Sequence, residues 1–290
     1  MHPKYTALLS MIVTAITAVL TKEGLHAEPT AIAAASTGVV TVAHAIVHPP
    51  IRKKLRKVLP HKRKLNPSLG LWVWEGKDPH GDCKRALDNG YGWIAVKAHD
   101  GANRYNTDSI VSYQAICKSY GLKFGIWGYC RQWTDGLLAS QLCDDHKAAF
   151  YIADCEIEFE GMRRSLQADF CAVIRNRQKD LDLWLSSFGR IDLHPDIDWR
   201  AFRDAGFGFM PQAYSCDSRE LDPSVCYRHA RDLWGHERIQ PTLGAYTGAL
   251  GRLTPTQLRQ SCAGLKLSGV NVWDAQNATD ADLAEVSKVL

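Results

Sequence analysis

Residues 151–160 read YIADCEIEFE, an apolar segment that runs directly into acidic residues at every second position. In a β-strand, the side chains at positions i, i+2 and i+4 point to the same face. The pattern therefore predicts a buried strand whose end carries Asp154, Glu156 and Glu158 on one face, about 6–7 Å from one to the next. The alternative interpretation is an exposed edge strand with a solvated acidic face.

Paired carboxyl groups at such a spacing are suited to acid–base chemistry. When two of them lie close together and partly out of water, one pKa rises while the other group stays ionised, so that one site holds an acid and a base. The chain has no Gly-x-Ser-x-Gly motif to mark a serine nucleophile. The carboxylates are therefore its strongest catalytic candidates.

The alternation of a short apolar strand with an amphipathic helix recurs eight times from residue 69 to the end. The predicted strands are 69–74, 92–98, 123–129, 149–156, 181–187, 208–213, 240–245 and 269–275. The predicted helices are 82–89, 108–120, 134–147, 165–179, 197–205, 223–234, 255–264 and 280–289. Eight such units in a segment of this length predict a (β/α)8 barrel. An open doubly wound sheet is disfavoured, because no Gly-x-Gly-x-x-Gly follows the first strand.

The amino-terminal part of the chain has a different composition. Apolar segments at 7–20 and 31–47 flank a polar turn and predict an α-helical hairpin over residues 1–48. A basic, proline-containing linker follows at 49–67, and the barrel occupies 68–290. We expect the hairpin to be an ordered assembly element; a membrane-associated hairpin and a secretory signal are the alternatives.

The amino-acid composition is typical of a globular protein, and the net charge of the chain is small. Charged residues make up 23% and hydrophobic residues 46% of the chain, with a formal net charge of +4. The positive charge gathers in residues 52–64, which are expected either to form a solvated linker or to contact an anionic surface or partner, with no specific nucleic-acid binding. The nine cysteines form no Cys-x-x-Cys pair and fall mostly in apolar elements, so we expect reduced thiols, no metal site and no cofactor. A Cys216–Cys226 disulfide stays open as an alternative.

A barrel brings together the side chains at the carboxyl ends of its strands. Here these ends carry aromatic, amide and acidic side chains, a combination that stacks on sugar rings and bonds their hydroxyl groups. Bulky Trp72, Trp127 and Trp184 are instead expected to fill the barrel interior. The candidate substrate-binding residues are Trp74, Glu75, Trp133, Glu158, Gln212, Tyr214, Tyr246 and Trp273.

With Asp154-Cys155-Glu156 ending the fourth of eight predicted strands, residues 69–290 resemble the muramidases of the Chalaropsis lysozyme type. More broadly, they resemble the glycoside-hydrolase-like barrels of bacteriophage and actinobacterial cell-wall proteins. The resemblance implies that Glu156 is the general acid, that Asp154 assists at the sugar and that Asp274 is the acid of the last strand. The first strand departs from the family pattern, because Trp72 stands where an aspartate is expected and Glu75 comes three residues late.

These observations predict a glycosidase-like barrel that binds and cleaves a cell-envelope glycan, such as peptidoglycan. Residues 1–48 are expected to tether it to a virion tail, through other virion proteins or copies of the same chain. One alternative is a non-catalytic minor tail component whose barrel binds glycan, which the substituted first strand favours. The other is an enzyme anchored in a membrane at the cell envelope.

Overall fold

The computed structural model describes residues 64–290. The predicted hairpin at 1–48 and most of the predicted linker at 49–67 lie outside this range, so both stay predictions. In the described part of the chain, no helix is long and apolar enough to cross a membrane.

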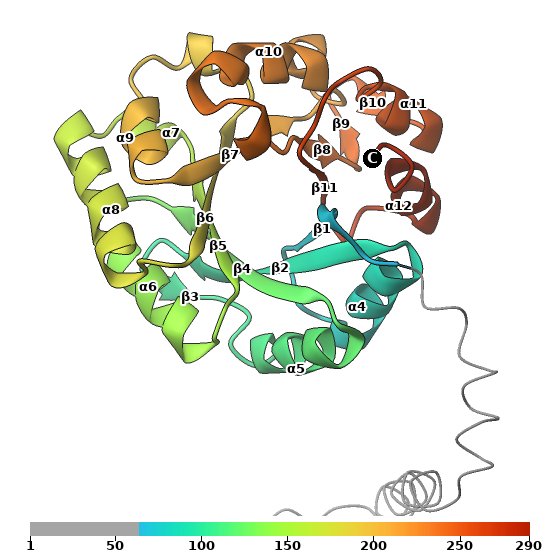
Figure 1. The fold of residues 1–290 in the computed structure, drawn as a ribbon, viewed down its shortest axis with the longest axis horizontal. Coiled ribbons are helices and arrows are strands. Elements are labelled where there is room, and N and C mark those ends of the chain that lie inside the picture. Colours follow the sequence, from blue (N-terminus) through green and yellow to red (C-terminus); the bar gives the residue numbers. More distant parts are fainter. Residues whose placement is uncertain (1–63) are drawn as a thin grey trace, which may run out of the picture. The chain divides into compact units, whose positions relative to one another are not determined.

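Eight parallel strands close into a barrel, with helices around the outside (Figure 1). The strands are β1 (Asn66–Val73), β2 (Tyr91–Asp100), β4 (Lys123–Cys130), β5 (Phe150–Cys155), β6 (Asp182–Phe188), β7 (Phe207–Ala213), β8 (Thr242–Gly244) and β11 (Val270–Trp273). Strand β1 pairs with β2 on one side and with β11 on the other, which closes the sheet. The predicted (β/α)8 fold is therefore confirmed, and the open-sheet alternative is wrong.

The predicted helices are all present, most of them within a few residues of the expected bounds. They are α4 (Pro79–Asp88), α5 (Ile110–Tyr120), α6 (Asp135–Asp145), α8 (Arg164–Arg177), α9 (Trp199–Asp204), α10 (Pro223–Trp234), α11 (Pro255–Gln260) and α12 (Asp280–Val286). Short elements that the periodicity did not predict are β3 (Asn103–Arg104), α7 (Ile157–Glu160), β9 (Thr247–Gly248), β10 (Gly251–Arg252), η1 (Ile191–Leu193), η2 (Arg219–Leu221) and η3 (His236–Arg238). Most of these lie in loops between a strand and the next helix.

Local sequence signals place the helix ends. Helices α11 and α12 each begin with a capping box, in which Thr254 or Thr279 accepts a hydrogen bond from the backbone three residues on. Helix α5 ends at Gly121, whose φ of 75° is in the left-handed region that glycine adopts without strain. These signals stop each helix where the chain must turn back towards the barrel.

The barrel interior is filled by large side chains that face small ones. Its central cluster is Trp72, Trp93, Ala95, Trp127, Phe150, Ile152, Trp184 and Met210, which confirms that the three tryptophans predicted to fill the barrel do so. A Cβ atom on Gly70 would lie 1.8 Å from the Trp93 ring, and one on Gly125 would lie 2.2 Å from Phe150. Glycine at these positions therefore makes the room that the aromatic rings occupy.

A second, larger core lies between the outer face of the barrel and the helices. All nine cysteines are free thiols and all are buried, so the Cys216–Cys226 disulfide does not form. Cysteine acts here as a small apolar residue in the packing between layers.

Candidate active site

Asp154 and Glu156 lie at the carboxyl end of β5, as the strand pattern predicted. Asp154 is within the strand and only 5% exposed, and Glu156 is the first residue beyond it and is half-buried. In the barrel, Asp154 is in register with Tyr129 of β4 and with Ser186 of β6. The two carboxyl groups therefore stand at one end of the barrel interior, above the aromatic filling.

Gln212, the predicted amide of β7, joins the two carboxyl groups. Its Nε2 donates to Asp154 Oδ1 at 3.1 Å and to Glu156 Oε1 at 2.6 Å. Because one nitrogen contacts both oxygens, these oxygens are no more than about 6 Å apart. The sequence could predict the acids and the amide separately, but only closure of the barrel brings β7 to β5 through β6.

Burial sets the protonation of this pair. Loss of solvent raises the pKa of Asp154 well above its usual value, and the neighbouring Glu156 charge raises it further, against hydrogen bonds from Ser186 and Gln212. Loss of solvent also raises the pKa of Glu156, against the Gln212 bond and with the help of Glu158. The pair therefore retains protons at a higher pH than free carboxylic acids do, which is what a general acid requires.

Glu158 does not share the strand face of Asp154, so this part of the sequence prediction is wrong. The chain leaves β5 at Cys155 and turns into α7, because Phe159 is drawn into the outer core against Phe170 of α8. Glu158 instead accepts hydrogen bonds from Tyr129 Oη at 2.7 Å and from Arg131 Nη1 at 2.8 Å. Its place is on the rim of the barrel beside β4.

Three charged side chains that continue from Glu158 along this rim were not among the predicted site residues. Arg131 also donates from Nε to Asp100 at 2.8 Å, and Lys97 Nζ donates to the other oxygen of Asp100 at 2.9 Å. Burial alone would raise the pKa of Asp100, but the bonds from Lys97 and Arg131 outweigh it and hold this pKa below its usual value. Lys97 could have been found from sequence, because it is a cation within an otherwise apolar strand.

Aromatic rings form a platform beside the carboxyl groups. Trp273, at the end of β11, has its ring centroid 5.5 Å from Trp72, 5.2 Å from Trp127 and 5.9 Å from Trp74. Trp74 follows β1 and is 43% exposed, so part of its ring is open to solvent. The predicted pair Trp74 and Trp273 is therefore brought together.

Tyr214 and Tyr246 also meet, with ring centroids 5.7 Å apart in an edge-to-face arrangement. Burial raises the pKa of Tyr214 well above its usual value, and the charges of Asp154 and Glu156 are among the further causes. Tyr246 donates a hydrogen bond to Asp217, which ties the segment after β8 to the loop after β7.

The other predicted acids are not joined to this pair. Asp274 is fully buried and accepts from the backbone and side chain of Asn277 at 3.1 Å and 2.8 Å, so it orders its own loop. Burial raises its pKa, against these Asn277 bonds. Glu75 is exposed and forms an ion pair with Lys77. No contact in residues 64–290 joins Asp274 or Glu75 to Asp154 or Glu156.

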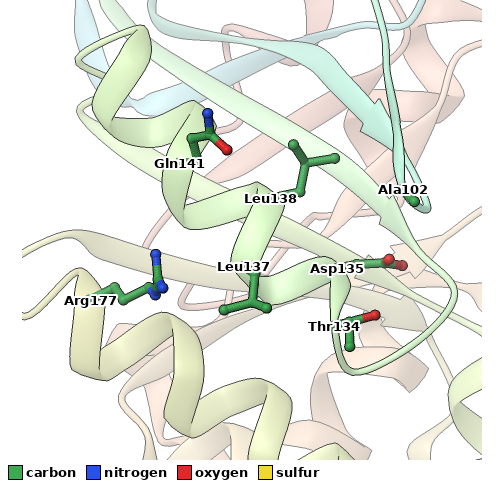
Figure 2. A pocket seen from close by; sticks show the side chains of 7 residues that line it. All are labelled: Ala102, Thr134, Asp135, Leu137, Leu138, Gln141 and Arg177. Carbon is green, nitrogen blue, oxygen red and sulfur yellow. The ribbon is translucent and has the colours of Figure 1, made fainter.

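Trp133 packs against the outer core and away from the other predicted sugar-binding rings. Near it, a hollow of about 440 Å³ lies along α6, bordered by Ala102 after β2 and by Arg177 of α8 (Figure 2). None of the predicted site residues lines this hollow. Within the described chain, no group of three or more histidine, cysteine, aspartate or glutamate side chains is arranged to hold a metal ion.

Comparison with known structures finds similar barrels among enzymes named as chitinases and as spore cortex-lytic enzymes. A chitinase from Chromobacterium violaceum matches with a TM-score of 0.63 at 14% identity, over 77% of this chain and 99% of that one. A class V chitinase from Pseudomonas fluorescens matches with a TM-score of 0.64 at 10% identity, over 77% of this chain and 99% of that one. The spore cortex-lytic enzyme SleL from Bacillus megaterium matches with a TM-score of 0.58 at 9% identity, over 79% of this chain and 75% of that one. At these identities the likeness establishes the fold.

Neither a protein-family profile nor a curated protein matches the sequence. The structural matches support the (β/α)8 fold that the sequence predicted. The particular muramidase family and the bacteriophage setting stay predictions.

The burial of Asp154 predicts a specific pH dependence of stability. Since its folded-state pKa is raised, the folded protein binds this proton more tightly than the unfolded chain, and stability falls as pH rises from about 4 through the folded pKa. Asp154→Asn removes this titration while keeping an oxygen to accept from Gln212. We expect the variant to be more stable than wild type at pH 7, by on the order of 1–3 kcal/mol.

Urea unfolding at pH 7 and pH 4 measures the difference between the two proteins. The gain should be much smaller at pH 4, where the folded state keeps the proton and about half of the unfolded chains also bind it. Asp169→Asn, which changes an exposed carboxyl on α8, is the matched control and should show no gain. The same gain at both pH values would contradict the assigned burial effect.

Proposed function

We propose that the barrel is a glycoside hydrolase that cleaves β-linked glycans of N-acetylated sugars, with Glu156 as proton donor. The observation that carries the proposal is the pair of carboxyl groups at the end of β5, joined by Gln212 and partly removed from water. The matched chitinases and the cortex-lytic enzyme are named for activity on glycans, which supports this substrate class.

The two carboxyl groups have different roles because they differ in exposure. Glu156 is half-buried at the mouth, so its carboxyl can reach the oxygen of a glycosidic bond and protonate it. Asp154 lies deeper and is joined to Glu156 through Gln212, so its carboxyl assists at the sugar by hydrogen bonding. Trp74 and Trp273, whose rings lie next to each other, supply an aromatic surface for a sugar unit.

The stereochemical course follows from which group attacks the sugar. The oxygens bridged by Gln212 are closer than the roughly 6.5–9.5 Å that separates the two carboxyl groups of inverting glycosidases, a rule that does not apply to substrate-assisted enzymes. Because Asp154 is nearly covered, the nucleophile is the acetamido oxygen of the substrate itself, and water then opens the product of that attack. The anomeric configuration is retained.

The first-strand departure from the family pattern does not remove an acid from this pair. Trp72 is part of the barrel filling, and its indole Nε1 donates to Asn271 Oδ1 at 2.6 Å. The residue that replaces the expected aspartate thus completes the packing below the site, while Asp154, Glu156 and Gln212 lie above it.

Substitution of Glu156 tests the assigned acid. Glu156→Gln should lower the release of reducing ends from peptidoglycan and from chitin oligosaccharides by about 10²–10⁴-fold, because the side chain keeps its shape but cannot donate a proton. Glu237→Gln, at an exposed glutamate of η3, is the matched control and should retain full activity. Equal release by Glu156→Gln and wild type would overturn the assignment. Glycan binding without release by wild type would move the function to recognition.

The product anomer tests the proposed course of the reaction. Proton NMR during hydrolysis of a β-linked N-acetylglucosamine oligosaccharide should show the β-anomer first, followed by slow mutarotation. The same oligosaccharide without its acetyl groups should not be cleaved, since it lacks the internal nucleophile. Initial release of the α-anomer would contradict the retaining mechanism.

The proposal also assigns residues 1–48 to attachment of the barrel to a virion, with attachment to a membrane as the alternative. It is supported by the apolar segments 7–20 and 31–47 and by the basic run 52–64. Flotation of the full chain with anionic vesicles distinguishes attachment to a virion from attachment to a membrane. A full chain that stays in the soluble fraction and forms oligomers supports assembly, whereas one that floats with the vesicles refutes it.

A further inference from the structure

Four charged side chains form a continuous chain across the rim of the barrel next to β5. Lys97 bonds Asp100 at 2.9 Å, Asp100 bonds Arg131 at 2.8 Å, and Arg131 bonds Glu158 at 2.8 Å. They belong to β2, to the segment after β4, and to α7. Ion pairs between exposed side chains contribute little to stability, but here one member of the chain, Lys97, is buried.

The Glu158 carboxylate is fixed by two different donors. Arg131 bonds Oε1, and the hydroxyl of Tyr129 bonds Oε2 at 2.7 Å. The Arg131 guanidinium also lies 4.8 Å from the centre of the Tyr129 ring. Because Tyr129 is in register with Asp154 on the neighbouring strand, this arrangement holds Glu158 close to the carboxyl pair.

Helix α7 connects Glu158 to Glu156 through the backbone. The amides of Phe159 and Glu160 donate to the carbonyl oxygen of Glu156 at 2.9 Å and 3.2 Å, so the turn begins on the proposed acid itself. Glu160 bonds His194 at 3.1 Å, which holds the far end of the turn. A shift of Glu158 therefore moves the residue that donates the proton.

We infer that Glu158, held by Arg131, is a positioning residue that sets both the charge beside Glu156 and the placement of the turn that begins at Glu156. Neither side chain touches the bond to be cleaved. Arg131 neutralises Glu158, and Glu158 supplies a negative charge two residues from the acid, which favours the protonated form of Glu156.

Other charged and polar groups also surround Glu156, and none of the substitutions described below changes them. Asp154 of β5, Tyr129 of β4 and Tyr214 after β7 each interact electrostatically with Glu156. Lys97 acts on Asp154 from β2, and Gln212 and Ser186 contribute hydrogen bonds. Since all of them are left in place, a change in the titration of Glu156 reports on Arg131 and Glu158.

The two partners of the ion pair should have opposite effects. Glu158→Gln removes a negative charge, so Glu156 loses its proton more easily and the alkaline limb of the pH–rate profile moves to lower pH. Arg131→Met leaves Glu158 unneutralised, so the limb moves to higher pH. We expect shifts of roughly 0.5–1 pH unit in each case. Arg131→Lys keeps the charge and should return the limb towards its wild-type position.

The same variants separate positioning from simple stabilisation. Both single substitutions should lower kcat about tenfold or more with little change in KM, because the acid is misplaced while the sugar platform is untouched. Shifts of the limb in the same direction, or no shift in either variant, would overturn the inference. Loss of activity that follows a fall in Tm, with an unchanged pH profile, would also overturn it.

The inference rests on the proposed function for its kinetic readout, and a second measurement does not depend on it. Carbon-13 NMR of the full chain with labelled glutamate follows the titration of Glu156 directly, with Glu156→Gln identifying the resonance. If wild type hydrolyses no glycan, the proposed function fails, while opposite titration shifts in Glu158→Gln and Arg131→Met still support the pair. Unshifted titrations would refute the pair even in an active enzyme.

Discussion

The packing of aromatic rings inside the barrel is the constraint on which the remaining structure depends. Eight strands can close only if the interior is filled without gaps, and here tryptophan and phenylalanine rings fill it against glycine. Gly70 faces Trp93, and Gly125 faces Phe150, so a larger side chain at either glycine would collide with a ring. This filling holds the strand ends at fixed positions and forms the floor beneath the site.

Above that floor, polar groups are tolerated because they are bonded to one another. Burying two carboxyl groups is costly unless they share a proton or gain hydrogen bonds. Gln212 bonds both Asp154 and Glu156, and Ser186 lies near the same amide. The residual cost appears as the raised pKa of both acids, which burial causes. The feature that weakens the folded state is therefore the one that prepares a proton donor.

The rim around the pair is organised differently from its centre. At the centre, the carboxyl groups are largely buried and are joined by one amide, whereas the rim is a chain of ion pairs from Lys97 to Glu158 that links β2, β4 and α7. Exposed pairs of this kind add little to stability individually. Their effect here is geometric, because α7 begins on the backbone carbonyl of Glu156 and is tied to β4 by Glu158.

The sequence by itself determined the number of βα units, the helix limits at residues such as Gly121 and Thr254, and the barrel-filling role of Trp72, because these follow from periodicity, capping and side-chain size. Tertiary structure alone decided which candidates meet. Gln212 of β7 donates a hydrogen bond to Asp154 of β5, whereas Asp274 accepts one from Asn277 in its own loop. Burial of Phe159 ended β5 early and removed Glu158 from the strand face. Such contacts join residues far apart in the chain, and no local pattern specifies them.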